Sequence, residues 1–137
     1  MIKRSILLFI FMQLNLFGLL YAQKENIKFE QILNPDAPFF GSINCIHQDK
    51  KGFLWLGTER GLNRYDGYDF VTFTHHPDQK DSIYSDRIRA ICETQSGELW
   101  IGTYGGGLNK FDSSSEGFFA YKYKSIDPNS LSNNQIN

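Results

Sequence analysis

The sequence has few cysteines and little net charge, and each of these limits the classes of protein and partner that have to be considered. Its two cysteines, Cys45 and Cys92, invite a disulfide if the protein is exported. They fall at different places in a repeated unit, however, so we expect two small buried apolar residues instead. The composition, 41% hydrophobic and 21% charged, is that of a globular protein.

No apolar run is long enough to cross a bilayer. The stretch from Ile6 to Leu20 has 15 residues, whereas a membrane-spanning helix needs about 20. Two basic residues precede it and the small residue Ala22 follows, which is typical of a secretory signal peptide over residues 1–22 with cleavage between Ala22 and Gln23. We therefore expect export.

Cationic charge is also scarce. Loss of the signal peptide leaves 12 basic residues (14 less the two removed) against 15 acidic ones, a formal charge of −3. A polyanion such as nucleic acid is therefore not an expected partner.

What the sequence does contain is a repeat. Ile88 repeats Ile43 at a spacing of 45 residues, and Ile136 opens a third copy 48 residues after Ile88. The structural repeat motif comprises Gly52, Leu54, Trp55, Gly57, Thr58, Gly61, Leu62, Asn63 and Asp66 in the first copy, and Gly97, Leu99, Trp100, Gly102, Thr103, Gly107, Leu108, Asn109 and Asp112 in the second. A period of this length indicates a repeat architecture.

Glycine recurs too often in the motif for helical repeats, which leaves short strands between turns. Four can be placed in the first copy: residues 42–48, FLWLGT, GLNRYD and YDFVTF. Four-stranded antiparallel units of about 45 residues are the blades of a β-propeller. We therefore expect an all-β fold in which Trp55 and Trp100 fill the space between neighbouring blades.

The stretches DKKGFLWLGTERGLNRYDGYDFVTF and GELWIGTYGGGLNKFD closely resemble the two-component regulator propeller repeat, over about residues 43–137. That repeat is found in tandem in periplasmic sensors of hybrid two-component systems, typically from Bacteroides-like bacteria. The resemblance implies many blades, then a β-sandwich linker, an inner-membrane helix, a histidine kinase, usually a receiver and often a DNA-binding domain. It also implies recognition of oligosaccharides released from glycans, and it leaves open a homodimer of the full-length protein.

The chain departs from that pattern because it stops after two blades, with no kinase motif. We expect an N-terminal piece of a periplasmic sensor without a catalytic site of its own, whose membrane contact is limited to the signal peptide or a downstream helix. The expected parts are a signal peptide at 1–22, a lead-in at 23–41, blades at 42–87 and 88–135, and the start of a third blade at 136–137. Two alternatives stay open: part of an extracytoplasmic propeller enzyme acting on glycans, and a propeller scaffold for protein interactions.

No catalytic, metal or cofactor chemistry can be assigned. The glycine-rich run from Gly102 to Gly107 leads into another strand and not into a helix, so it is not expected to cradle phosphate. Asp49 stands one residue too far from its glycine for the Asp-box of sialidase-type propellers, and turn formation suffices as its role. We expect His47, His75 and His76 to be solvated loop residues, with no metal site.

Ligand recognition is expected in the loops at one end of the blades. The loop between the second and third strands differs between the copies, with Glu59 and Arg60 in the first and Tyr104 followed by two glycines in the second. Arginine can pair with a carboxylate and tyrosine can stack on a sugar face. Glu59, Arg60 and Tyr104 are therefore the candidate ligand-binding residues, for a sugar or a uronic acid.

Repeat units need neighbours on both sides, and propellers close with about four to eight blades. Residues 23–137 alone would leave one apolar face of each end sheet in water, so we expect this segment to aggregate or fold poorly when produced by itself. Thermal unfolding and analytical ultracentrifugation check this expectation. A cooperative transition from a soluble monomer would contradict it.

Overall fold

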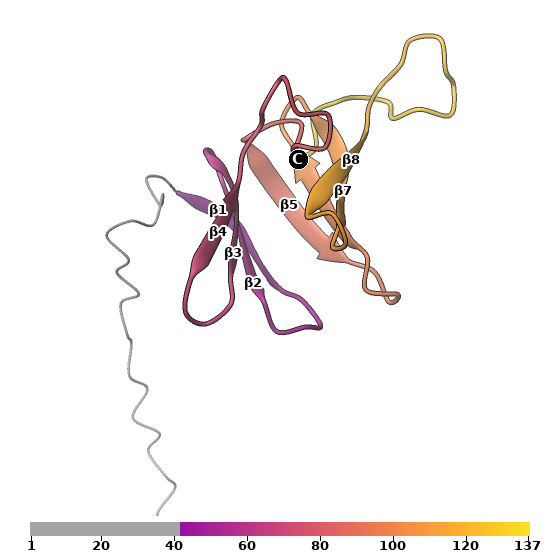
Figure 1. Cartoon of the computed structure of the whole chain (residues 1–137). Helices are drawn as coiled ribbons and strands as arrows, with labels where there is room; N and C mark the ends of the chain where they lie inside the picture. Colours follow the sequence, from indigo (N-terminus) through magenta and orange to yellow (C-terminus); the bar gives the residue numbers. More distant parts are fainter. Residues whose placement is uncertain (1–41) are drawn as a thin grey trace, which may run out of the picture. The chain divides into compact units, whose positions relative to one another are not determined.

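The computed structural model describes residues 42–137, which form eight strands (Figure 1). They are β1 (Ile43–Gln48), β2 (Leu54–Thr58), β3 (Gly61–Tyr65), β4 (Phe70–Phe73), β5 (Ile88–Glu93), β6 (Leu99–Thr103), β7 (Gly107–Asp112) and β8 (Gly117–Tyr121). The predicted signal peptide, its cleavage position and the lead-in segment lie outside the described residues. Residues 42–137 include no helix with the length and hydropathy of a membrane span.

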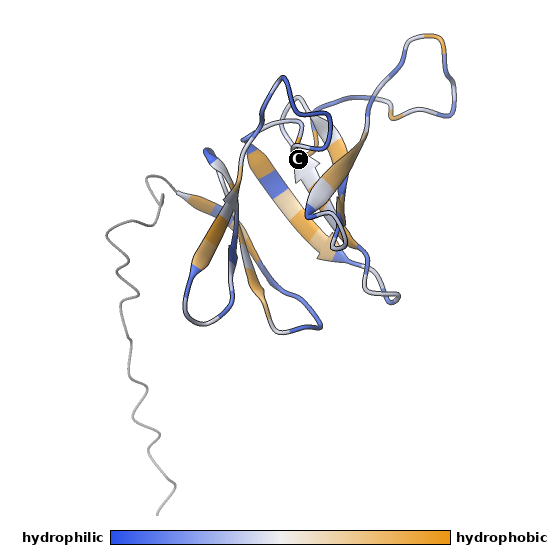
Figure 2. Cartoon of the chain, in the orientation of Figure 1, coloured by the Kyte–Doolittle hydropathy of each residue, from blue (hydrophilic) through white to orange (hydrophobic). Residues whose placement is uncertain are grey.

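The strands make two four-stranded antiparallel sheets, each a simple meander in the order β1-β2-β3-β4 or β5-β6-β7-β8. This confirms the predicted all-β fold of propeller blades. The copies agree even in their irregularities, because the register shifts between Ile43 and Cys45 in β1 and between Ile88 and Ala90 in β5. Figure 2 shows the hydrophobic residues concentrated on the strands and the hydrophilic ones in the connecting turns.

The core lies between the two sheets, where Trp55 of β2 is only 1% exposed. Its ring centroid is 5.0 Å from that of Phe111 in β7, and Phe73 of β4 lies 5.5 Å from Phe118 in β8. Trp55 thus fills the space between neighbouring sheets, as the repeat predicts. Trp100, at the same place in the second sheet, is partly exposed, and its ring contact is with Tyr121 of its own sheet.

The motif glycines make room for the next copy of the repeat. A Cβ atom on Gly57 would lie 2.6 Å from Cγ2 of Ile88, and one on Gly102 would lie 2.6 Å from Cγ2 of Ile136. Real Cβ contacts essentially never come so close, so a side chain at either glycine would push the next copy away. Ile136, the first repeated residue of the third copy, therefore packs against Gly102 of the second sheet as Ile88 packs against Gly57 of the first.

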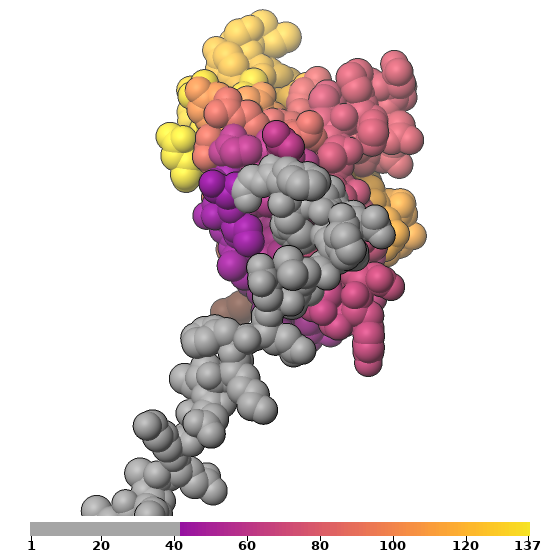
Figure 3. All heavy atoms as spheres, turned by 90° about the vertical axis from the view of Figure 1, so that its left-hand side faces the viewer, coloured from indigo at the N-terminus to yellow at the C-terminus, as the bar shows by residue number. Residues whose placement is uncertain are grey.

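The segments that follow β4 and β8 are held by the same hydrogen bonds. The N–H of Gly61 donates to the carbonyl oxygen of Asp86 at 2.8 Å, and that of Gly107 donates to Asn134 at 2.9 Å. Figure 3 shows the two segments at the same end of the molecule. The segment after β4 is therefore bound to the β2–β3 turn of the first sheet. The segment after β8 is bound in the same way to the β6–β7 turn of the second sheet.

Asp49 closes the turn between β1 and β2. Its Oδ1 accepts the backbone N–H groups of Lys51 (3.0 Å) and Phe53 (2.9 Å), and its Oδ2 accepts the indole N–H of Trp55 at 2.8 Å. The predicted turn-forming role is confirmed, and the bond to Trp55 adds a second one. Thr94 is the counterpart of Asp49 in the second copy. Its Oγ1 accepts the backbone N–H of Glu98 at 3.0 Å, and the hydrogen-bond partners of this oxygen all lie within the same turn.

Two sequence-based expectations are wrong. Cys45 and Cys92 are both free, but neither is fully buried: Cys45 is half-buried and Cys92 is exposed. Cys92 pairs with Trp100 on a face that no sheet of residues 42–137 covers. His47 is not a loop residue either. It belongs to β1, and its Nε2 lies 3.6 Å from Oε2 of Glu93 on the second sheet.

We expect Trp55→Ala to cost about 3–5 kcal/mol in local stability, because it removes a fully buried aromatic side chain. The control is Tyr68→Ala, with an expected change within about 0.5 kcal/mol because that side chain is 89% exposed in the β3–β4 turn. Hydrogen exchange of the strand amides in the full-length protein measures both. Equal losses of protection would contradict the assignment of Trp55 to the core between sheets.

Asp49→Ala should destabilise the first sheet by about 2–4 kcal/mol, since three donors lose a charged acceptor. Thr94→Ala, at the matching place in the second copy, should cost only about 1 kcal/mol. The same exchange measurement, read on the amides of β2 and β6, compares the two. An Asp49→Ala variant as protected as Thr94→Ala would show that the bond to the Trp55 indole contributes little.

Candidate functional site

Charged and aromatic side chains gather where the β2–β3 turn meets the beginning of β5. Glu59 comes from that turn, Arg87 directly precedes β5, and Arg89 lies within it. Nε of Arg87 donates to Oε2 of Glu59 at 3.0 Å, and a terminal nitrogen of Arg89 lies 2.8 Å from Oε1 of Glu59. Together with Asn44 and Tyr104 we call these residues the loop-end cluster.

Tyr104, at the beginning of the β6–β7 turn, supports both arginines. The guanidinium carbon of Arg87 lies 4.3 Å from its ring centroid, and that of Arg89 lies 5.5 Å away. Both distances are within the range of cation–π attraction. The backbone N–H of Tyr104 donates to the carbonyl oxygen of Arg87 at 2.8 Å, so the turn carrying the ring is tied to the chain carrying the cations.

The carboxylate of Glu59 is held in its charged form. Hydrogen bonds from Arg87 and from the Asn44 amide, the latter 3.0 Å long, lower the pKa of Glu59 below its usual range. Two guanidinium groups therefore share one carboxylate, and these three side chains carry one net positive charge. The site is on the surface, so water and ligands reach it.

The structure brings together two of the three predicted ligand-binding residues, Glu59 and Tyr104. Arg60 lies apart from them: its side chain is exposed, and within residues 42–137 its guanidinium has no hydrogen bond or ion pair. Its backbone N–H donates to Oγ1 of Thr58, which shapes the turn.

Sequence reasoning missed Arg87 and Arg89. One signal was present, because two arginines two residues apart at the beginning of a strand point to the same side. Their pairing with Glu59 had no local signal, since Glu59 precedes Arg87 by 28 residues and strands β3 and β4 lie between them in the sequence.

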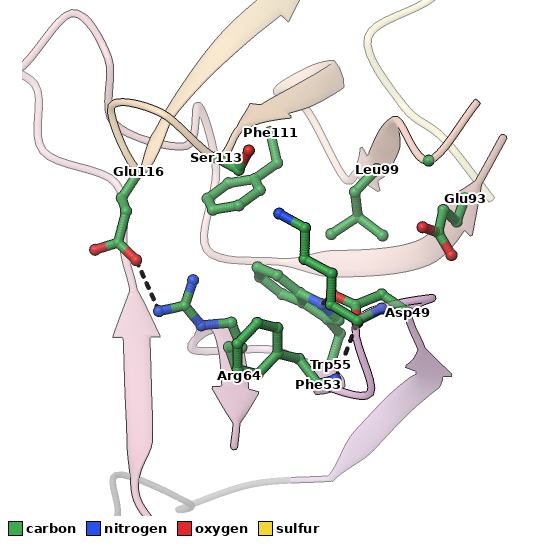
Figure 4. A pocket seen from close by; sticks show the side chains of 11 residues that line it. Asp49, Phe53, Trp55, Arg64, Glu93, Leu99, Phe111, Ser113 and Glu116 are labelled. Atoms are coloured by element: carbon green, nitrogen blue, oxygen red, sulfur yellow. Dashed lines mark hydrogen bonds and ion pairs between the residues drawn. The ribbon is translucent and has the colours of Figure 1, made fainter.

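A pocket lies at the opposite end of the sheets from the loop-end cluster, between the two sheets (Figure 4). This seam pocket has a volume of about 270 Å³, and its lining includes Phe53, Trp55, Arg64, Phe111 and Glu116. Arg64 donates to Glu116 of the second sheet at 2.7 Å, and its guanidinium lies 5.0 Å from the Phe53 ring centroid. These contacts link the two sheets, so the charged groups of Arg64 and Glu116 are already paired with each other.

Metal binding finds no support in the part of the chain that the structure describes. Residues 42–137 contain no group of three histidine, cysteine, aspartate or glutamate side chains arranged to hold an ion.

Both copies of the repeat match a known protein family. Residues 39–60 and 85–105 match the family described as two component regulator propeller. A curated relative, Histidine kinase P4 of Formosa agariphila, is 38% identical over 79 residues, which are 58% of this chain and 6% of the kinase.

Two solved structures from B. thetaiotaomicron have the same fold. The extracellular domain of a hybrid two component system is 35% identical with a TM-score of 0.60, over 69% of this chain and 14% of that one. The extracellular domain of a one component system is 29% identical with a TM-score of 0.51, over 59% of this chain and 11% of that one.

The chain thus spans a small part of each of these proteins. Both family matches begin just before the first strand of a sheet and end in the β2–β3 or β6–β7 turn. Each of the two sheets of residues 42–137 therefore contains a match to the two component regulator propeller repeat, and the fold is similar to that of the extracellular domain of the hybrid two component system.

Proposed function

We propose that the chain contributes blades to the exported, periplasmic ligand-sensing propeller of a two-component sensor. The support comes from its relatives: the two solved structures are named as extracellular domains, and the curated relative is named as a histidine kinase. In this proposal the chain recognises a ligand and performs no catalysis. A histidine kinase elsewhere in the full-length, membrane-anchored protein receives the signal.

The proposed ligand is an oligosaccharide released from a glycan, and it contacts the loop-end cluster. One observation carries this assignment: the matched β2–β3 and β6–β7 turns, which differ between the copies, place Glu59 and the ring of Tyr104 around the same pair of arginines. Framework residues of the repeat are alike in both sheets, whereas these turn residues are not. Variable polar and aromatic groups on a rigid sheet scaffold are typical of a binding surface.

Tyr104→Ala should weaken oligosaccharide binding by roughly tenfold, because it removes both the stacking surface and the support of the two arginines. Arg60→Ala should change affinity less, about twofold, since its guanidinium stands apart from the cluster. Calorimetry on the full-length protein, with oligosaccharide pools made by partial digestion of plant and algal polysaccharides, measures both.

The matched control is Tyr68→Ala, because Tyr68 is 89% exposed in the β3–β4 turn at the other end of the sheets. Its removal should leave affinity unchanged. If Tyr104→Ala binds every pool as tightly as the unmodified protein, the loop-end cluster is not the ligand site.

A further inference from the structure

We propose that the loop-end cluster is a carboxylate-binding site which Glu59 occupies in the absence of ligand, and that an acidic oligosaccharide binds by taking the place of the Glu59 carboxylate between Arg87 and Arg89. The inference rests on the proposed function, because it names the class of oligosaccharide that the propeller senses. Glu59 then acts as an internal competitor for the ligand.

The spacing of the two arginines fits one carboxylate. Each oxygen of Glu59 is met by a different guanidinium, Oε2 by Arg87 at 3.0 Å and Oε1 by Arg89 at 2.8 Å. A planar group with two equivalent oxygens is what this arrangement binds, and guanidinium groups are the side chains best suited to it. The carboxylate of a uronic acid has the same shape and charge as that of glutamate, so it can make the same two contacts.

Glu59 does not engage all the N–H groups of the two arginines. A guanidinium carries five N–H groups, and Glu59 engages only Nε of Arg87 and one terminal nitrogen of Arg89. No other acceptor within residues 42–137 contacts the remaining guanidinium nitrogens. The side chains of Arg87 and Glu59 are 49% and 37% exposed, so a ligand can reach them.

Tyr104 keeps the site formed when Glu59 leaves. Its ring lies against both guanidinium groups, which fixes their positions independently of the carboxylate between them. Positions set in advance reduce the ordering cost of binding. The part of the ring that stays exposed can cover an apolar sugar face.

Charge makes the exchange selective. A neutral sugar cannot replace Glu59, because the two cations would then lose their only carboxylate. An acidic sugar replaces one carboxylate by another, so the spare donors and the tyrosine ring provide the net gain. Glu59→Gln should keep the shape of the turn while removing the competing charge, and so should tighten the binding of acidic ligands.

The test uses the full-length protein and two acidic probes, oligogalacturonides and alginate oligosaccharides. Each probe is compared with its carboxyl-reduced form, which has the same linkages and no charge. Calorimetry should show binding of at least one acidic probe and at least a tenfold loss on reduction. Glu59→Gln should tighten that binding about three- to tenfold, and Arg87→Gln and Arg89→Gln should each weaken it about tenfold or more.

Two controls keep the test independent of folding. Lys51→Gln removes a cation from the seam pocket at the other end of the sheets and should leave affinity unchanged. Raising the ionic strength from about 0.02 to 0.3 M should weaken binding of the acidic probe to the unmodified protein, because exposed charges are screened. That measurement needs no variant.

Several results would overturn the inference, and they separate it from the proposed function. If carboxyl-reduced probes bind as tightly as acidic ones, the carboxylate site is wrong while oligosaccharide sensing stands. Weaker binding by Glu59→Gln would mean that Glu59 contacts the ligand directly and does not compete with it. If neither form of either probe binds, the carboxylate site is rejected, and the digestion pools used for Tyr104→Ala then decide the proposed function separately.

Discussion

The packing of one sheet face against the next copy of the repeat is the interaction on which the other features depend. Trp55 is buried only because Phe111 and its neighbours come from the second sheet. The sheets approach closely because Gly57 leaves room for Ile88. Burial of apolar surface is the main favourable term in folding, and here neither sheet can bury this face by itself.

The loop-end cluster follows from the same packing. Glu59 lies in the β2–β3 turn, whereas Arg87 directly precedes β5 and Arg89 lies within it, so the three meet only where the two copies join. The seam pocket at the other end forms in the same way, with Arg64 donating across to Glu116. Both ends of the seam thus combine residues that are distant in the sequence, whereas the residues within each sheet pair locally.

This difference explains what could be predicted from the sequence. The glycines, the tryptophans and the 45-residue spacing specify strands and turns, because each acts on its own neighbours, and the four-strand blades followed directly. Glu59 and Tyr104 were identifiable because they differ at matched turn positions. Arg87 and Arg89 were not, since their role depends on the distance across the seam, and Cys92 was misjudged because burial depends on what covers a sheet face.

The hydrogen bond from Gly61 to Asp86 gives the molecule a mechanical property. It links the turn that carries Glu59 to Asp86, the residue just before Arg87, so the β2–β3 turn and the beginning of β5 are joined by the backbone itself. The same link recurs from Gly107 to Asn134. Any displacement of the β2–β3 turn that keeps the bond from Gly61 to Asp86 therefore also displaces the beginning of β5, without any change in the core between the sheets.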